Sequence, residues 1–228
     1  MLVELIKTFQ FEAAHRRGGR LHGHSYIAEL RCAGECDPKL GWLIDYGDIS
    51  CCFEPLYRQL DHHLLEEVEG LAETSLAGLE QWLTERLAVD IPHFDTVRVR
   101  IAGACAFRPE RVEHPDIFGA PPRVRFGFEA AHFLPNLPPA HKCHNMHGHS
   151  FCVDVAAADL GAVEPGIRSA YDVLDRRCLN EIDGLYNATS EQVARWVWEH
   201  LQGKGKDGGL TSVTVAETCT ARCVYRGR

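Results

Sequence analysis

Three histidines recur in the same frame at two places in this chain, and this repetition restricts the possible folds more than any other feature. The first set is His15, His22 and His24, and the second is His132, His147 and His149. In both copies Phe-Glu-Ala-Ala-His precedes His-Gly-His-Ser. Because side chains alternate between the two faces of a strand, both histidines of a His-x-His motif point to one face. A third histidine on a neighbouring strand completes a pocket of three nitrogen ligands with one open position, which is typical of catalytic zinc.

The two copies predict two domains of the same architecture. Their first histidines are 117 residues apart, at positions 15 and 132, and their His-Gly-His motifs are 125 apart, at positions 22 and 147, so the second copy has eight extra residues in between. Further along, Leu60-Asp61 aligns with Leu174-Asp175 at an offset of 114, so the second copy has then lost eleven residues. We assign this loss to part of residues 41–46 and the helix that follows.

The stretch between the copies, residues 107–122, is rich in proline and charge and has no hydrophobic period, which predicts a linker. The predicted domains are therefore residues 1–106 and 123–228. Runs of strands with helices to one side indicate an α+β class with antiparallel sheets.

Apolar spacing predicts the same order of elements in both copies: strand, strand, helix, helix, strand, strand. In the first copy the expected strands are 3–11, 25–32 and 97–102, and the expected helices are 46–60 and 75–87. Pro55 predicts a kink or break in the first of these helices. In the second copy the expected strands are 123–131, 150–157 and 212–217, and the expected helix is 190–201.

Composition excludes several classes of protein. The chain has 228 residues, of which 45% are hydrophobic and 25% charged, as in an ordinary soluble globular protein. A net charge of −8 argues against a nucleic-acid binder, and a zinc-dependent nucleic-acid module would need finger spacing and a basic surface. No apolar run approaches the roughly 18 residues of a membrane span. The start reads as a strand and not as a signal, so we expect no membrane partner, a cytoplasmic location and ten reduced cysteines.

A cysteine adjoins the second histidine set. Cys143 lies four residues before His147, so its loop is expected to lie beside the metal. A nearby cation would favour its thiolate and make it a base or nucleophile, whereas the alternative is a buried structural thiol. We expect the flanking His141 and His144 to be solvated loop residues.

Two acidic residues also suit roles in proton transfer or in substrate binding. Asp61 precedes His62, and a carboxylate can orient and charge-stabilise an imidazole that moves protons; the alternative is a cap at a helix end. Glu217, at the end of the last predicted strand, can hold the guanidine-like edge of a pterin with two hydrogen bonds, or can be an ordinary surface residue.

Together these residues resemble the 6-pyruvoyl-tetrahydropterin synthase / 6-carboxy-tetrahydropterin synthase family. The matching stretches are Phe-Glu-Ala-Ala-His, Cys-x-x-x-His-Gly-His-Ser, Gly-Trp-x-x-Asp-Tyr, Leu-Asp-His-His, Ala-Thr-Ser-Glu and Glu-Thr-Cys-Thr, which run through nearly the whole chain. The three-residue gap between Cys143 and His147 resembles the 6-carboxy branch, which serves queuosine and other deazapurine pathways.

The resemblance implies a T-fold, an antiparallel four-stranded sheet with two helices, which subunits assemble into a barrel. It implies a zinc-dependent lyase that acts on 7,8-dihydroneopterin triphosphate with loss of triphosphate and acetaldehyde. By position, it assigns the zinc to His132, His147 and His149, the proton-abstracting base to Cys143, its partner dyad to Asp61 and His62, and pterin binding to Glu217, Thr189, Ser190 and Glu191. A 6-pyruvoyl-type product and a non-catalytic pterin-binding protein are the alternatives.

Neither copy carries the complete set of family residues. The first has no counterpart of Cys143, and Ile101 stands where the second copy has Glu217. The second copy keeps Asp175, but Arg176 and Arg177 replace the two histidines. We therefore predict one composite site per chain, with zinc, thiol and pterin anchor from the second half and the dyad from the first.

The first histidine set is left without a complete site around it. We expect it to bind zinc structurally, unless Arg16, Arg17 and Arg20 fill the pocket instead. The resemblance further implies a homo-oligomer, in which two or three chains form the barrels.

Overall fold

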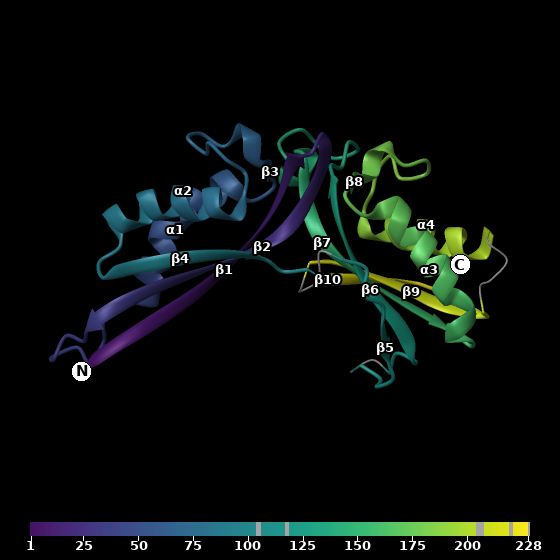
Figure 1. The fold of residues 1–228 in the computed structure, drawn as a ribbon, viewed down its shortest axis with the longest axis horizontal. Coiled ribbons are helices and arrows are strands. Elements are labelled where there is room, and N and C mark those ends of the chain that lie inside the picture. The colour runs from purple at the N-terminus through teal and green to yellow at the C-terminus, as the bar shows by residue number, and fades with distance from the viewer. Residues whose placement is uncertain (104–105, 117–118, 204–207, 219–220, 228) are drawn as a thin grey trace.

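The computed structural model describes residues 1–103, 106–116, 119–203, 208–218 and 221–227. It shows two sheets, each covered on one face by two helices, that meet at the ends of their long hairpins and form an arch (Figure 1). We call the elements β1–β4, α1 and α2 the front half, and β5–β10, α3 and α4 the back half. No helix in the described part of the chain has the length and apolar character that crossing a bilayer requires.

The front half is built on one long hairpin. Its elements are β1 (Leu2–Arg17), β2 (Arg20–Glu35), α1 (Tyr46–Leu60), β3 (His63–Leu64), a 3₁₀ turn (Leu65–Glu67), α2 (Leu76–Asp90) and β4 (Phe94–Ile101), with strand order β3-β1-β2-β4. β1 pairs with β2 over its whole length, whereas β3 adds only two residues in parallel. Alternate residues along much of the hairpin, including Phe11 and Tyr26, belong to a hydrophobic core that they share with the helices.

The back half repeats this plan. Its elements are β5 (Glu110–Val112), β6 (Arg123–His132), a 3₁₀ turn (Lys142–His144), β7 (His147–Ala157), α3 (Leu160–Leu174), β8 (Arg177–Cys178), a second turn (Leu179–Glu181), α4 (Ser190–Gly203), β9 (Leu210–Thr218) and β10 (Ala221–Tyr225). The order is β10-β9-β7-β6-β5, and β8 pairs with β6 in parallel. Each half has a hydrophobic core of its own, so the predicted α+β class with two tandem units is confirmed.

One prediction about the elements of the second copy was wrong. The second copy has not lost a helix: α3 has 15 residues, as α1 does, and the eleven missing residues fall in the loop before it and in the shorter strand β7. Apolar residues at helical spacing bury one face of α3. Pro165 lies within this pattern, and the sequence therefore did not predict a helix here. In the first copy, Pro55 does not break α1, which runs continuously from Tyr46 to Leu60, and the kink given as the other outcome stays a prediction.

The histidine motifs lie within the strands and not after them. The predicted strands 3–11 and 25–32 extend in the structure to Arg17 and back to Arg20, so His15 and His22 form a pair in the β1–β2 ladder. The predicted linker contains β5, which adds three residues to the edge of β6.

The two halves touch where their hairpins cross. A Cβ added to Gly23 would lie 2.4 Å from the Cα of Gly148, and one added to Gly148 would lie 2.3 Å from the Cα of Gly23. Beside this contact, the backbone N–H of Ser25 donates to Oγ of Ser150, and the N–H of Ser150 donates to Oγ of Ser25, both at 3.1 Å. The central glycine of each His-Gly-His motif is therefore required for the approach of two backbones.

We predict that Gly148→Ala lowers the free energy of unfolding by about 1–3 kcal/mol, because the new methyl group has no space between two backbones. Denaturant unfolding measures the change. Gly161→Ala, at the start of α3, is the matched control: its Cβ would meet only the side chains of Asp159 at 3.3 Å and Arg111 at 4.0 Å. Equal stability of the two variants would contradict the close crossing.

Candidate active site

Three buried histidines converge at the end of the β6–β7 hairpin; we call His132, His147 and His149 the back pocket. The Nδ1 atom of each ring faces an acceptor: the carbonyl of Ala188 at 2.7 Å, the carbonyl of Asn145 at 2.8 Å and Oε2 of Glu12 at 2.9 Å, respectively. A ring that donates from Nδ1 presents the lone pair of Nε2, which is the arrangement that partner groups around metal-binding histidines produce.

The donor set of the back pocket fits a divalent metal ion. Nε2 of His147 is buried and makes no hydrogen bond, and Nε2 of His132 is buried and faces the carboxylate of Glu217. Buried polar atoms without a hydrogen-bond partner are rare in folded proteins, and a metal ion would satisfy Nε2 of His147. Burial lowers the pKa of His149 to about 3 and that of His147 well below its usual range, so both rings are neutral at neutral pH, as metal ligands must be.

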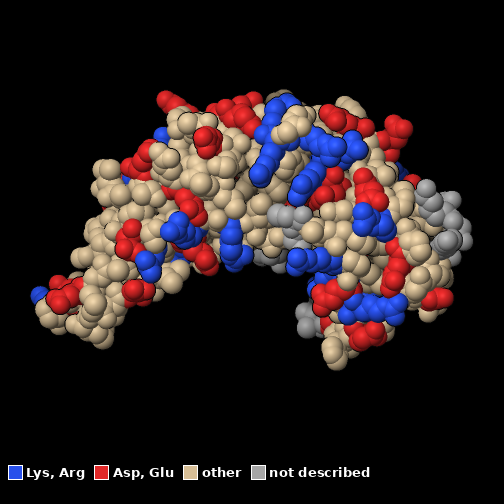
Figure 2. Space-filling view, viewed as in Figure 1, with Lys and Arg blue, Asp and Glu red and all other residues tan. Residues whose placement is uncertain are grey.

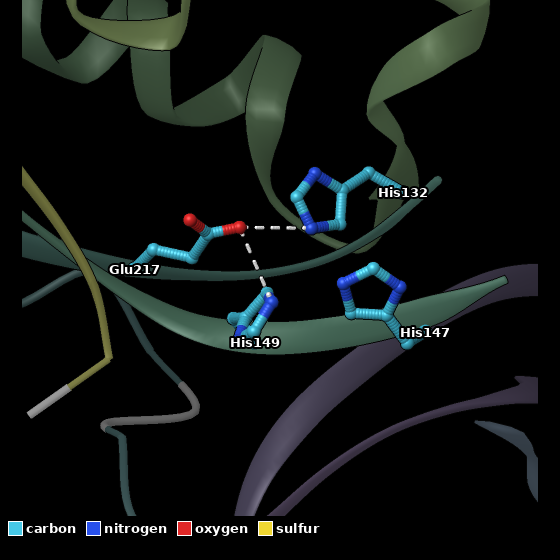
Figure 3. Close-up of side chains that lie close together, drawn as sticks. All are labelled: His132, His147, His149 and Glu217. Atoms are coloured by element: carbon cyan, nitrogen blue, oxygen red, sulfur yellow. Dashed lines mark ion pairs between the residues drawn. The ribbon is translucent and has the colours of Figure 1, made fainter. Parts of the chain in front are cut away.

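Glu217, at the end of β9, points into the back pocket (Figure 3). Its Oε1 lies 3.0 Å from Nε2 of His132 and 3.3 Å from Nε2 of His149. Burial would raise the pKa of this carboxyl, but the neighbouring rings of His132 and His149 lower it below the usual value. A negatively charged oxygen is thus held beside the three nitrogens, all within 4.8 Å of one another.

The front half holds an equivalent cluster, His15, His22 and His24, which we call the front pocket. All three rings are buried, and Nε2 of His15 lies 3.1 Å from Nε2 of His22. Burial lowers the pKa of both His15 and His24 to about 4. These neutral nitrogens also suit a metal ion.

Each pocket is supported by a carboxylate from the other half. Oε2 of Glu12, on β1, lies 2.9 Å from Nδ1 of His149. Oε2 of Glu129, on β6, lies 2.6 Å from Nδ1 of His24. The hydroxyl of Ser25 donates to Glu12 at 2.5 Å, and that of Ser150 donates to Glu129 at 2.7 Å. Burial raises the pKa of Glu12 to about 7 and that of Glu129 to about 8.

The dyad of the front half lies against the back pocket within the same chain. His62 follows α1 with a left-handed backbone, φ 62°, and its ring stacks on His147 with centroids 4.2 Å apart. Its Nδ1 lies 2.9 Å from Oδ2 of Asp61. Burial would raise the pKa of Asp61, but His62, the backbone N–H of Glu12 and Lys142 lower it below its ordinary value. A positive φ is uncommon for a residue other than glycine and persists where the surrounding structure imposes it. Here the backbone N–H of His62 donates to the carbonyl of Glu12 at 2.6 Å.

Cys143 completes this arrangement. Its Sγ, a nitrogen of His62 and a nitrogen of His147 lie within 4.8 Å of one another. The structure therefore brings the thiol loop of the back half and the dyad of the front half together. Burial and the nearby Glu217 raise the pKa of the Cys143 thiol, whereas Lys142 lowers it.

The flanking residues fix the thiol loop, which corrects the expectation that they are merely solvated. The N–H of Cys143 donates to Nδ1 of His141 at 3.1 Å, and Nδ1 of His144 lies 3.1 Å from the carbonyl of Leu137. Lys142 crosses to the front half, where its Nζ lies 3.1 Å from Oδ2 of Asp61.

The remaining predicted substrate residues lie at the start of α4. Thr189 and Ser190 are half-buried and follow Ala188, whose carbonyl faces His132, and Glu191 is exposed in the first turn of the helix. These three residues are therefore next in sequence to the backbone carbonyl of Ala188, which contacts His132 of the back pocket.

Sequence reasoning missed the residues that join the halves: Glu12, Glu129, Ser25, Ser150 and Lys142. The glutamates and serines occur at equivalent positions of both copies, which was the available signal. They point to the sheet face opposite the histidines, so strand alternation alone gave no reason to connect them with a metal.

Comparisons with known proteins agree with the duplication. A family model described as 6-pyruvoyl tetrahydropterin synthase matches residues 4–105 and again residues 123–228. A 6-carboxy-5,6,7,8-tetrahydropterin synthase of Synechocystis sp. is 39% identical over 116 residues, covering 44% of this chain and 88% of that protein. A dihydroneopterin monophosphate aldolase of Pyrococcus furiosus is 27% identical over 96 residues, covering 40% and 81%. The solved 6-pyruvoyl tetrahydropterin synthase of Caenorhabditis elegans matches with 14% identity and a TM-score of 0.29, covering 100% of this chain and 97% of that one.

We predict that Glu12→Ala weakens metal binding in the back pocket about 10–100-fold, although Glu12 belongs to the front half, because His149 loses the acceptor that orients it. Chelator competition in a His22→Ala background, where only the back pocket is intact, measures this affinity. Glu12→Gln keeps an acceptor oxygen and is expected to lose less. Glu4→Ala, an exposed glutamate of the same strand, is the control. An unchanged affinity in Glu12→Ala would contradict the crossed support.

Proposed function

The chain belongs to the 6-pyruvoyl tetrahydropterin synthase family, with two tandem T-fold units, and from this membership we propose that it is a zinc-dependent lyase of the 6-carboxy-tetrahydropterin synthase type. Membership in this family supports a pterin-processing lyase. The proposed substrate is 7,8-dihydroneopterin triphosphate, which loses triphosphate and acetaldehyde. The 39% identical relative supports this branch.

One observation carries the proposal: the thiol of one half and the aspartate–imidazole pair of the other lie beside the same three histidines. Each half alone is incomplete, because the front half has no thiol loop and the back half has Arg176 where the front half has His62. Folding of a single chain brings the missing groups together. This arrangement supports our proposal of one working site per chain, built within the chain.

The residues of the back pocket can hold zinc through Nε2 of His132, Nε2 of His147 and Nε2 of His149. When bound, the metal would polarise the side-chain oxygens of the substrate and stabilise the negative charge that develops there.

The thiol and the dyad divide the proton transfers between them. Cys143 takes a proton from the substrate side chain after a neighbour has removed the thiol proton, a transfer that the raised pKa of the thiol favours assigning to a nearby base. His62 is the neighbour in reach, and the carboxylate of Asp61 stabilises the imidazolium that results. Lys142 ties the thiol loop to Asp61 and so keeps Cys143 and His62 at a fixed separation.

Glu217 is proposed to anchor the pterin ring, with Thr189, Ser190 and Glu191 nearby. In the structure its carboxylate faces His132 and His149, so it has to turn from these rings towards a pterin when substrate and metal are bound. Its lowered pKa keeps it charged, as a bidentate contact to a guanidine-like edge requires.

We further propose that the chain has domains at residues 1–106 and 123–228 with a linker between them. We also propose that two or three chains associate through the edges of their sheets. The outer edge of β1 supports association, because β3 covers only Ala13 and Ala14. Leu2 and Ile6 of this strand are exposed. An uncovered strand edge of this length readily pairs with another chain.

We predict that mixing the whole-chain variants His62→Ala and Cys143→Ala restores no activity, because the dyad and the thiol meet within one chain. Each variant alone is expected to lose about 10²–10⁴-fold in kcat. Mass spectrometry of products formed from 7,8-dihydroneopterin triphosphate and zinc measures both. Partial activity in the mixture would place the composite site between chains, and full activity of His62→Ala would exclude a role for the dyad. Formation of a 6-pyruvoyl product would contradict the proposed 6-carboxy activity and identify the enzyme as a 6-pyruvoyl-type synthase.

We predict that Glu217→Gln raises KM for the pterin at least about tenfold and leaves the zinc content at the back pocket unchanged, because the amide cannot form the bidentate contact. Steady-state kinetics and metal analysis of the same preparation measure the two quantities. Loss of zinc in Glu217→Gln would instead identify Glu217 as a metal ligand.

A further inference from the structure

The loop that carries Cys143 contains no buried residue. Residues 133–146, all of which the structure describes, are exposed or half-buried. The loop lies at the top of the arch (Figure 1), where Figure 2 shows Lys and Arg side chains gathered at the surface. Because little apolar surface of this loop is removed from water, packing alone does not fix it, and the position of the thiol depends on the hydrogen bonds of the loop.

Asn180 holds the start of this loop with both ends of its side-chain amide. Its Oδ1 accepts from the backbone N–H of Phe133 at 2.9 Å, and its Nδ2 donates to the carbonyl of Phe133 at 2.8 Å. The same Nδ2 donates to the carbonyl of Tyr186 at 2.8 Å. One N–H and two carbonyls around the amide leave only one orientation for it. The preceding Leu179 is fully buried in the core of the back half, so Asn180 stands on a fixed support.

The contact at Phe133 reaches Cys143 through one further residue. The backbone N–H of Leu134 donates to the carbonyl of Cys143 at 2.8 Å, so the residue that follows Phe133 holds the backbone of the thiol residue itself. From the front half, Asp61 holds the neighbouring Lys142. The loop is thus tied at two places, by Asn180 within its own half and by Asp61 of the other.

The front half has a different residue at the equivalent position, and it has no thiol loop. Glu66 corresponds to Asn180 at the same offset of 114 that aligns the two aspartates, and its Oε1 accepts from the backbone N–H of Arg16 at 2.7 Å. An ionised carboxylate accepts hydrogen bonds but cannot donate them, whereas an amide does both. The residue that can hold an N–H and a carbonyl together therefore occurs in the half where the strand end leads into the thiol loop.

We propose that Asn180 is a positioning residue, which holds the thiol loop so that Cys143 stays beside His62 and His147. Sγ of Cys143 and one nitrogen of each ring lie within 4.8 Å of one another, and this grouping is what the amide maintains. The proposal rests on the proposed function for the use made of the thiol. Displacement of a reacting group by about 1 Å can lower a rate about 100-fold, so a contact two residues from the loop start is sufficient to affect turnover.

Asn180→Asp in the full chain tests the donor end of the amide. It keeps an oxygen that accepts from Phe133 and places the other against two carbonyls. We expect alkylation of Cys143 by iodoacetamide, followed by mass spectrometry, to become about fivefold faster relative to the exposed Cys51, as loss of one hydrogen bond that opposes local opening predicts. We expect kcat to fall at least about tenfold and KM to change less than about twofold, because the loop positions a reacting group and does not anchor the pterin.

Asn187→Asp is the matched control, with the same chemical change near the same loop. In the described part of the chain, the Asn187 side chain makes one hydrogen bond, in which Oδ1 accepts from the N–H of Asn136 at 3.5 Å, and aspartate keeps this acceptor. We expect alkylation and kcat to change less than about twofold. Equal effects in the two variants, or unchanged alkylation of Cys143 in Asn180→Asp, would overturn the proposal. A parallel increase at the half-buried Cys152 of β7 would also overturn it, since it would show a general loosening of the back half.

Alkylation is measured without substrate, so the test separates the position of the thiol from the proposed lyase activity. Faster alkylation of Cys143 in Asn180→Asp, with a wild type that has no activity, would support the contact and contradict the lyase. If Asn180→Asp does not fold, hydrogen exchange of the wild-type chain takes its place. We expect the N–H groups of Phe133 and Leu134 to exchange at least about tenfold more slowly than those of a free peptide, and exchange at the free rate would overturn the proposal.

Discussion

The crossing of two hairpins at Gly23 and Gly148 is the contact on which the rest of the arrangement depends. Two backbones approach so closely that neither position can carry a side chain, and reciprocal hydrogen bonds between Ser25 and Ser150 fix them in register. This contact sets the distance over which Glu12 and Glu129 reach the histidines of the opposite half. It also brings the end of α1, with His62, against His147. A shift of the crossing would therefore disturb both pockets at once.

The groups that the proposed reaction needs are divided between the two repeats of the chain. The back half keeps the thiol loop and Glu217, and the front half keeps the aspartate–imidazole pair. Burial lowers the pKa of His147 and His149 in the back pocket and of His15, His22 and His24 in the front pocket. Both pockets therefore bring together ring nitrogens able to hold a cation, while only the back pocket is surrounded by groups able to move protons.

Much of this could be predicted from the sequence, since a repeated motif fixes the repeat of the fold and strand alternation places both histidines of His-x-His on one face. The histidine clusters, the place of Glu217 near the end of β9 and the bounds of α1 follow from such local patterns. The support by Glu12 and Glu129 does not, because it arises from the packing of one sheet on the other and has no period along the chain. The prediction that the eleven missing residues belong to a helix was wrong for a similar reason. An alignment gives only the number of missing residues, whereas packing decides their place: α3 is needed for the core of the back half, and the loop before it is shorter.

The crossed glutamates also bear on how the two repeats can change over time. A substitution at Glu12 alters the environment of a ring more than a hundred positions away in the other repeat, so the Phe-Glu-Ala-Ala-His and His-Gly-His-Ser stretches serve both repeats jointly. The positions of His62, Cys143 and Glu217 each serve a single pocket, and there the repeats have diverged. Around the pockets, the two repeats thus share the residues that support both sites and differ at the residues that serve only one, so a change at a shared position acts on both halves of the molecule.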